Sequence, residues 1–104
     1  MNLYCLLLAE KKGKADEVII LKHGFLTDTS FTNIAIHDGN GWITPRRPLL
    51  YGTKRAALLD QGVLPEADLT IGDLQRATRV SLFNAMIDFG EREIAVHDIN
   101  TELI

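Results

Sequence analysis

Hydrophobic and polar positions along the 104-residue chain fall into short blocks, most of them bounded by glycine, proline or polar turn residues. In the first block, residues 2–12, Leu3, Leu6 and Leu7 stand at the i, i+3, i+4 spacing of one helical face. Asn2 could cap the start of such a helix, and Gly13 could end it. The pattern therefore predicts a helix over 2–12.

The next blocks are rich in β-branched and apolar residues, which favours strands. Their boundaries are turn sequences, His23-Gly24 and the glycine-rich 38–41, and Pro45 stops the last of them. An antiparallel meander is therefore predicted, with strands at 17–22, 25–28, 33–37 and 42–44.

The second half alternates short helical and short apolar segments. An irregular loop over 45–52 precedes a helix over 53–61, and a second helix over 71–78 has Leu74 and Ala77 facing inward, with a cap near Thr70 or Asp73. Further strands are predicted at 67–70, 80–83 and 93–99. No repeat or linker interrupts the chain, so we expect one α+β domain over 1–104, a mostly antiparallel sheet with short helices.

Composition narrows the class of protein. No window approaches the roughly 20 consecutive apolar residues of a membrane span, and no signal-peptide pattern is visible. The net charge of −3 argues against a protein that binds nucleic acid by neutralising phosphates. Cys5 is the single cysteine, and the three histidines have no metal-ligand spacing, so we expect neither a disulfide nor a metal site. The expectation is a soluble cytoplasmic protein.

Polar residues between predicted strands, at 27–33, form the first candidate for chemistry. A carboxylate at Asp28 could accept a charge-assisted hydrogen bond from a protonated ring nitrogen, and Asn33 opens the next strand. The alternative is a turn in which Asp28, Thr29 and Ser30 bond their own backbone. The residues alone leave both interpretations open.

Two more candidate segments also lie in loops next to predicted strands. Gly52 precedes a helix start, where backbone N–H groups favour an anion, and Thr53 with Lys54 or Arg55 could add a hydroxyl and a charge. An ordinary helix start fits equally well, because no Walker or dinucleotide fingerprint is present. The Asn84-Ala85 pair follows an apolar strand, where an amide binds a ligand or starts a turn.

The order of these segments resembles the C-terminal part of class IV aminotransferases, the fold-type-IV enzymes that use pyridoxal 5'-phosphate. The likeness lies in "ADEVIILKHGFLTDTSFTNIAIHDGNGWITP", "PLLYGTKRAALL" and "VSLFNAMID". The family includes branched-chain and D-amino-acid aminotransferases and aminodeoxychorismate lyase. The resemblance implies the fold of the C-terminal domain of D-amino-acid aminotransferase-like enzymes.

Carried over by position, the resemblance implies a set of residues that hold the cofactor. Asp28 would face the pyridine nitrogen, where the family usually has Glu, and Thr53 would provide a phosphate hydroxyl that in the family often falls one position later, at Lys54. The sequence "NAM" at 84–86 is more like the lyase branch. The implied cofactor-binding residues are Asp28, Asn33, Gly52, Thr53, Lys54, Asn84 and Ala85.

The resemblance also implies a reaction and its partners. The substrate would be an amino acid or an aminodeoxychorismate-like small molecule, handled by a homo-oligomer without nucleic acid or membrane. The family's Schiff-base lysine lies before the segment that 2–12 resembles, so no lysine here matches it, and we expect this chain alone to be inactive. The alternative is a truncated, non-catalytic remnant that acts as an interaction or oligomerisation module through Leu3, Leu6 and Leu7.

Overall fold

A three-stranded antiparallel sheet contains the N-terminal strands in the order β1-β2-β3. The computed structural model describes the backbone of residues 3–9, 15–29 and 32–96, and the side chains of 19–29 and 32–96. The strands are β1 (Leu3–Ala9), β2 (Ala15–Lys22) and β3 (Phe25–Asp28). The turn between β2 and β3 uses left-handed backbone at His23 and Gly24, with φ of 54° and 82°. This is the turn that the sequence predicted.

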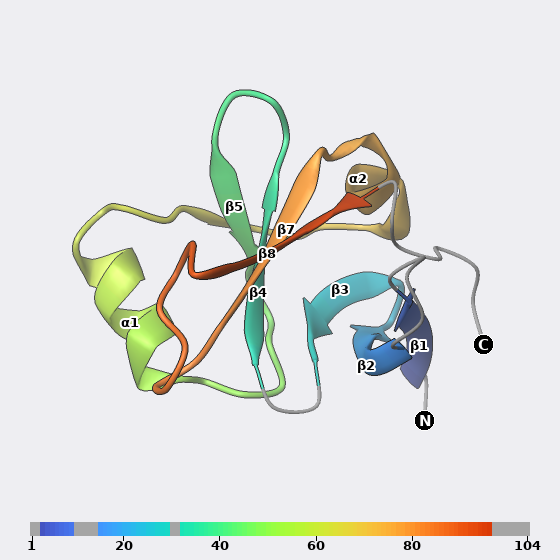
Figure 1. Ribbon diagram of the computed structural model, residues 1–104, viewed down its shortest axis with the longest axis horizontal. Helices are drawn as coiled ribbons and strands as arrows, with labels where there is room; N and C mark the ends of the chain where they lie inside the picture. Colours follow the sequence, from blue (N-terminus) through green and yellow to red (C-terminus); the bar gives the residue numbers. More distant parts are fainter. Residues whose placement is uncertain (1–2, 10–14, 30–31, 97–104) are drawn as a thin grey trace.

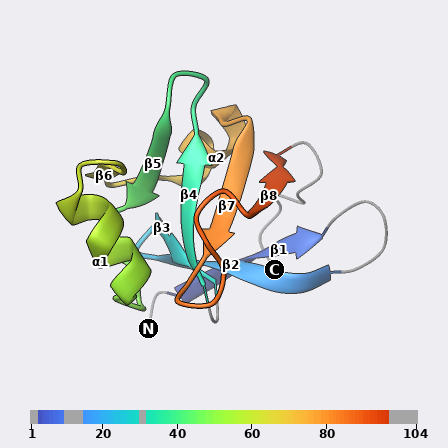
Figure 2. The same cartoon turned by 60° about the vertical axis from the view of Figure 1, so that its left-hand side comes forward.

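A five-stranded sheet follows, with the order β6-β5-β4-β7-β8. It runs across the first sheet rather than alongside it (Figure 2). The β5–β6 pair is parallel, and the other three pairs are antiparallel. The strands are β4 (Asn33–His37), β5 (Trp42–Pro45), β6 (Glu66–Ala67), β7 (Arg79–Phe83) and β8 (Arg92–Ala95).

Two short helices complete the fold (Figure 1). Helix α1 (Thr53–Asp60) lies between β5 and β6 in the chain, and α2 (Ile71–Arg76) lies between β6 and β7. A reciprocal capping box starts α2, because the Thr70 hydroxyl accepts from the Asp73 N–H while the Asp73 carboxylate accepts from the Thr70 N–H. Both residues are those that the sequence marked as caps. Neither helix in the described part of the chain is long and apolar enough to cross a membrane.

Strand β4 lies between two apolar clusters, which explains why four of its five residues are buried. Ile34 and Ile36 pack with Ile19 and Leu26 of the first sheet in the larger cluster. Ala35, on the opposite face, packs in a smaller cluster whose partly buried members include Leu58 of α1. Successive side chains of a strand point to opposite faces, so β4 joins the two halves of the core.

The predicted helix over 2–12 is wrong. Residues 3–9 form β1, which pairs antiparallel with β2 from Leu3 opposite Lys22 to Ala9 opposite Ala15. The periodicity of a short apolar run does not distinguish a strand from a buried helix. The available pairing partner, β2, decides that this segment is a strand. The expected helical face at Leu3, Leu6 and Leu7 lies outside the described side chains.

The predicted four-strand meander is also wrong at its centre. Strands β3 and β4 belong to different sheets, so the meander is divided into the β2–β3 and β4–β5 hairpins. The Thr29 N–H donates to the Thr32 carbonyl at 3.0 Å, which closes a turn between the two sheets. The strand predicted at 67–70 is β6, at Glu66–Ala67, with an isolated bridge from Thr70 to Phe25. The strand predicted at 93–99 is β8, and residues 97–99 lie outside the described part.

Candidate functional site

Asp28 ends β3 as a fully buried carboxylate, with an exposed fraction of 0%. Its Oδ2 accepts the backbone N–H of Leu50 at 2.7 Å, across 22 residues of sequence. Its Oδ1 is buried and has no hydrogen-bond partner among the described residues. An acceptor in this state costs free energy unless a donor reaches it, so Asp28 is suited to receive a donor from a bound molecule.

Burial raises the pKa of Asp28 above its ordinary value of 3.8, because the charged form loses its hydration. The Leu50 N–H lowers the pKa, with smaller contributions in the same direction from the Thr27 side chain, the Leu49 N–H and the positive charge of Arg55. A cationic donor placed at Oδ1 would also favour the ionised carboxylate. The site therefore holds a buried carboxylate whose ionised form a cationic donor would stabilise.

Asn33, the first residue of β4, holds the other side of the same peptide. Its Nδ2 donates to the Leu50 carbonyl at 2.7 Å. A Cβ added at Gly52 would lie only 2.5 Å from Asn33 Oδ1, so a side chain does not fit there unless Asn33 moves. The structure thus brings Asp28, Asn33 and Gly52 together around Leu50.

The turn alternative considered for 28–30 holds for Thr29 but not for Asp28. The Oγ1 atoms of Thr29 and Thr32 are 2.6 Å apart, and the Thr32 N–H donates to Thr29 Oγ1 at 3.0 Å. Asp28 instead bonds the distant loop, and Ser30 lies outside the described residues. The hydroxyls close the turn, while the carboxylate is directed toward the loop.

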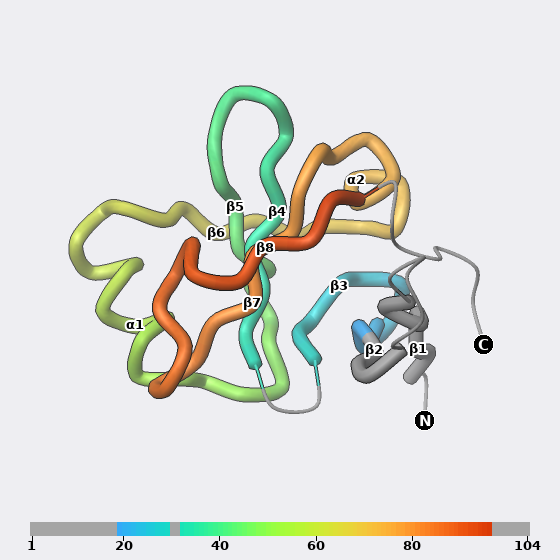
Figure 3. The backbone as a smooth tube through the Cα atoms, in the orientation of Figure 1, coloured from blue at the N-terminus to red at the C-terminus, as the bar shows by residue number. Residues whose placement is uncertain are grey.

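At the start of α1, Gly52 is an extended N-cap without a side-chain cap, and Thr53 is exposed. Lys54 Nζ lies 2.6 Å from Asp88 Oδ1, which pairs the lysine with a carboxylate of the segment after β7. Figure 3 shows residues 84–91 passing beside the start of α1. Two of the three candidate segments are therefore neighbours in space.

Asn84 starts a turn, which was one of the two interpretations of this residue. Its Oδ1 accepts the N–H groups of Met86 at 2.8 Å and Ile87 at 2.9 Å. Ala85 is exposed, and Met86 has an exposed fraction of 89%. The turn leaves the Ala85–Met86 backbone at the surface, on the segment that Lys54 contacts through Asp88.

With this geometry established, comparison with known proteins identifies the family. The family profile described as amino-transferase class IV matches residues 1–91. The chain belongs to the class IV aminotransferase family. This family uses pyridoxal 5'-phosphate and acts on amino acid substrates. The family resemblance and the α+β fold inferred from the sequence are confirmed.

Among class IV relatives, the chain is similar to the aminodeoxychorismate lyase of Saccharomyces cerevisiae, with 40% identity over 73 residues, 64% of this chain and 20% of the relative. It is similar to a solved structure from Haemophilus somnus, a protein provisionally assigned as a 4-amino-4-deoxychorismate lyase. That match has 39% identity and a TM-score of 0.66, and it covers 73% of this chain and 39% of the other. A 4-amino-4-deoxychorismate lyase structure from Pseudomonas aeruginosa matches at 26% identity and a TM-score of 0.60, over 71% and 30%.

The class IV chain spans less than half the length of these relatives. A curated relative, an uncharacterised Haemophilus influenzae protein at 37% identity, is matched over 42% of its length. The comparisons therefore establish the family and the fold, and the activity of this chain is a separate question.

Arg55 has a role in the class IV chain that the sequence analysis missed. It was considered as a surface charge for an anion, but its exposed fraction is 5%. Its Nη2 donates to the Pro45 carbonyl at 3.1 Å and to Glu66 Oε2 at 2.9 Å, so it fixes the start of loop 45–52. The available signal was helical spacing, because position 55 shares a face with Leu58, three residues on.

Proposed function

We propose that this chain is the C-terminal, cofactor-binding part of a class IV enzyme of the aminotransferase or aminodeoxychorismate lyase type. The observation that carries the proposal is Asp28 Oδ1, a buried acceptor without a donor among the described residues. A protonated pyridine nitrogen is a donor of the right charge for it. The residues present therefore fit the cofactor at this position.

Pyridoxal 5'-phosphate supplies an electron sink for the substrate's α-carbanion when its ring nitrogen is protonated. Asp28 would keep the proton on that nitrogen by accepting its N–H at Oδ1. The Leu50 N–H fixes the other oxygen, and Asn33 fixes the Leu50 carbonyl, so the carboxylate is oriented before anything binds. Because Asp is one methylene shorter than the usual Glu, either the ring would lie closer to the strand or the strand would shift.

The phosphate would be held by the start of α1 together with the turn at Asn84. Backbone N–H groups after Gly52 and the Thr53 hydroxyl are donors for an anion, and the helix dipole favours a negative charge there. Lys54 lies on the same turn and would share its charge between Asp88 and the phosphate. Asn84 and Ala85 supply a second small polar edge on the neighbouring segment.

The substrate of the proposed enzyme is an amino acid or an aminodeoxychorismate-like molecule, and the reaction is transamination or elimination. Similarity to a lyase at 40% identity supports the second of these. The Schiff-base lysine is not assigned to any residue of 1–104. Homo-oligomerisation and the cytoplasmic location inferred from the sequence stay predictions.

The test compares two ligands on two proteins. Pyridoxal 5'-phosphate and its 1-deaza analogue, in which carbon replaces the ring nitrogen, are titrated against the wild-type chain and Asp28→Asn, with absorbance and fluorescence as readouts. We expect the wild type to prefer the natural cofactor by about tenfold, because one charge-assisted hydrogen bond contributes roughly 1.5–3 kcal/mol. In Asp28→Asn the preference is expected to disappear.

The matched control is Asp38→Asn, which removes an exposed carboxylate elsewhere. It is expected to keep the wild-type preference. An undiminished preference in Asp28→Asn would overturn the assignment of Asp28. Absence of saturable binding by the wild type would overturn the proposal that this chain holds the cofactor.

A non-catalytic interaction module is the second candidate, because apolar side chains are exposed together on loop 45–52. The exposed fractions of Leu49, Leu50 and Tyr51 are 39%, 41% and 74%. Consecutive exposed apolar residues are typical of a contact surface. In this case Tyr51→Ser would weaken self-association measured by sedimentation, and Asp28→Asn would leave it unchanged; association that ignores Tyr51→Ser would exclude this surface.

A further inference from the structure

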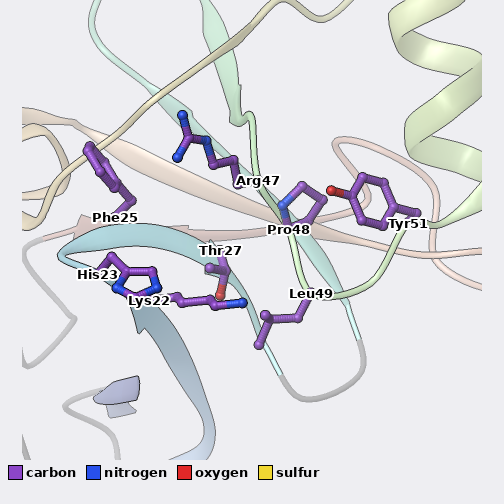
Figure 4. A pocket seen from close by; sticks show the side chains of 8 residues that line it. All are labelled: Lys22, His23, Phe25, Thr27, Arg47, Pro48, Leu49 and Tyr51. Atoms are coloured by element: carbon purple, nitrogen blue, oxygen red, sulfur yellow. The ribbon is translucent and has the colours of Figure 1, made fainter. Parts of the chain in front are cut away.

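A cavity of about 310 Å³ lies between the β2–β3 hairpin and loop 45–52 (Figure 4). Thr27 lines it, whereas the next residue of β3, Asp28, is not among the lining residues. The cavity and the proposed ring-nitrogen site are therefore lined by different residues of β3, although the same strand and the same loop contribute to both.

The lining of the cavity is positively charged. Lys22 and Arg47 line it, and no acidic side chain does. The nearest carboxylate partner of Arg47 is Asp68, at 3.5 Å, and Asp68 also pairs with Arg46 at 3.3 Å. One carboxylate thus serves two guanidinium groups, and no ion pair of Lys22 occurs within the described residues. An anion entering the cavity would meet unbalanced positive charge.

Four further residues add apolar surface to the lining. Phe25 and Tyr51 contribute aromatic rings, and Pro48 and Leu49 contribute aliphatic surface. The Arg47 guanidinium carbon lies 5.9 Å from the centre of the Phe25 ring, and Figure 4 shows its side chain extending toward that ring. The volume is at the lower end of ligand cavities, which run from about 300 Å³. These features suit one planar ring that carries one acidic group.

We propose that this cavity binds a small aromatic carboxylate. The carboxylate lies between Lys22 and Arg47, and the ring packs against Pro48 and Leu49. The observations that support this site do not involve the cofactor proposed at Asp28.

Binding at the cavity is coupled to Asp28 through loop 45–52. Leu49 and Tyr51 line the cavity, while the peptide of Leu50, between them, is held by Asp28 and Asn33. A ligand that packs against Pro48 and Leu49 therefore acts on the segment that orients the buried carboxylate. The cavity is thus a second binding site, and its occupation changes how the Leu50 peptide orients the Asp28 carboxylate.

The experiment is an amide NMR titration of the full chain with benzoate as the probe and neutral benzamide as the matched ligand. Benzoate is expected to give saturable shifts at residues 22–27 and 47–51, with the Leu50 amide among them. Benzamide is expected to bind at least about tenfold more weakly, because it lacks the charge. Lys22→Gln and Arg47→Gln are each expected to weaken benzoate about tenfold, and their spectra report that they are folded.

Arg76→Gln is the control variant, since Arg76 is an exposed arginine that does not line the cavity. It is expected to bind benzoate like the wild type. Equal binding of benzamide and benzoate, equal weakening by Arg76→Gln and Arg47→Gln, or no saturable shift would each overturn the site. Benzoate binding that leaves the Leu50 amide unmoved would overturn the coupling to Asp28.

Discussion

Two aspartates at the ends of strands have opposite surroundings: Asp28 is the last residue of β3, and Asp38 directly follows β4. Asp38 is exposed, and its Oδ1 accepts the N–H groups of Asn40 at 2.8 Å and Gly41 at 3.0 Å, within its own turn. Those bonds lower the pKa of Asp38 below 3.8. Asp28 is buried, bonds Leu50 far along the chain, and has its pKa raised by burial.

The difference shows what a carboxylate does in each place. At Asp38 the side chain completes a local turn, and solvent covers what the turn does not. At Asp28 the side chain holds a distant loop and retains one unpaired oxygen in the interior. A carboxylate whose hydrogen bonds are completed within its own turn has a structural role, whereas a buried carboxylate with an unpaired oxygen is a candidate binding residue.

Among the variants considered, Gly52→Ala is expected to cause the largest loss of unfolding free energy, because it disturbs the packing around Asp28. The new Cβ would approach Asn33 Oδ1 to 2.5 Å, and Asn33 is itself held to Leu50. Overpacking of this kind costs about 1–3 kcal/mol of unfolding free energy, measured by urea denaturation. Gly41→Ala, in the Asp38 turn, is the control, because nothing lies within 4 Å of its Cβ position. Equal losses in the two variants would contradict the close packing at Gly52.

Asn33→Ala is expected to lower the unfolding free energy by about 1 kcal/mol, since the hydrogen bond to the Leu50 carbonyl is lost. It should also reduce the cost of Gly52→Ala, because the atom that the new Cβ meets is gone. A double-mutant cycle with urea denaturation measures this coupling. Additive costs would show that the two residues do not interact.

Asp28→Asn is expected to change how stability depends on pH. Because the pKa of Asp28 is higher in the folded chain than the ordinary 3.8, the folded state binds more protons just above that pH. Wild-type stability relative to Asp28→Asn should therefore fall as pH rises from about 3.8, and level off once Asp28 is ionised in both states. Urea midpoints across this range measure the difference, and an increase with pH would contradict the burial effect.

Asp38→Asn is expected to give the smallest effect, with the opposite sign. The pKa of Asp38 is lower in the folded chain, so its contribution is present above 3.8 and disappears as pH falls through the folded value. The same urea series measures it. If wild-type stability relative to this variant rose as the pH fell, the turn hydrogen bonds would not be the cause of the lowered pKa.

Several elements could be predicted because their signals are local. The turns at 23–24 and 38–41, the start of α1 after Gly52 and the Thr70 cap of α2 depend on neighbours within a few residues, and all are present in the structure. The prediction of a helix over 2–12 is wrong because residues 3–9 pair with β2. The local pattern of residues 2–12 carries no information about that pairing partner.

The candidate site was only partly predictable for the same reason. Family resemblance selected Asp28, Asn33 and Gly52, and the structure places these three around Leu50. The selection of Thr53, Lys54, Asn84 and Ala85 stays a prediction. Nothing in the spacing of the residues indicated that Leu50 would join them, or that Arg55 would be buried beneath the loop.

The sequence by itself determined the turns, the caps, most of the strands and the family, because these depend on residue type at fixed short spacing. Only the tertiary structure decided that the chain changes sheet between β3 and β4, that β1 is a strand, and that Asp28 reaches across 22 residues to Leu50. Those outcomes depend on which surfaces of the folded chain are buried against one another. Burial of that kind is a property of the whole packed chain, and it is what raises the pKa of Asp28.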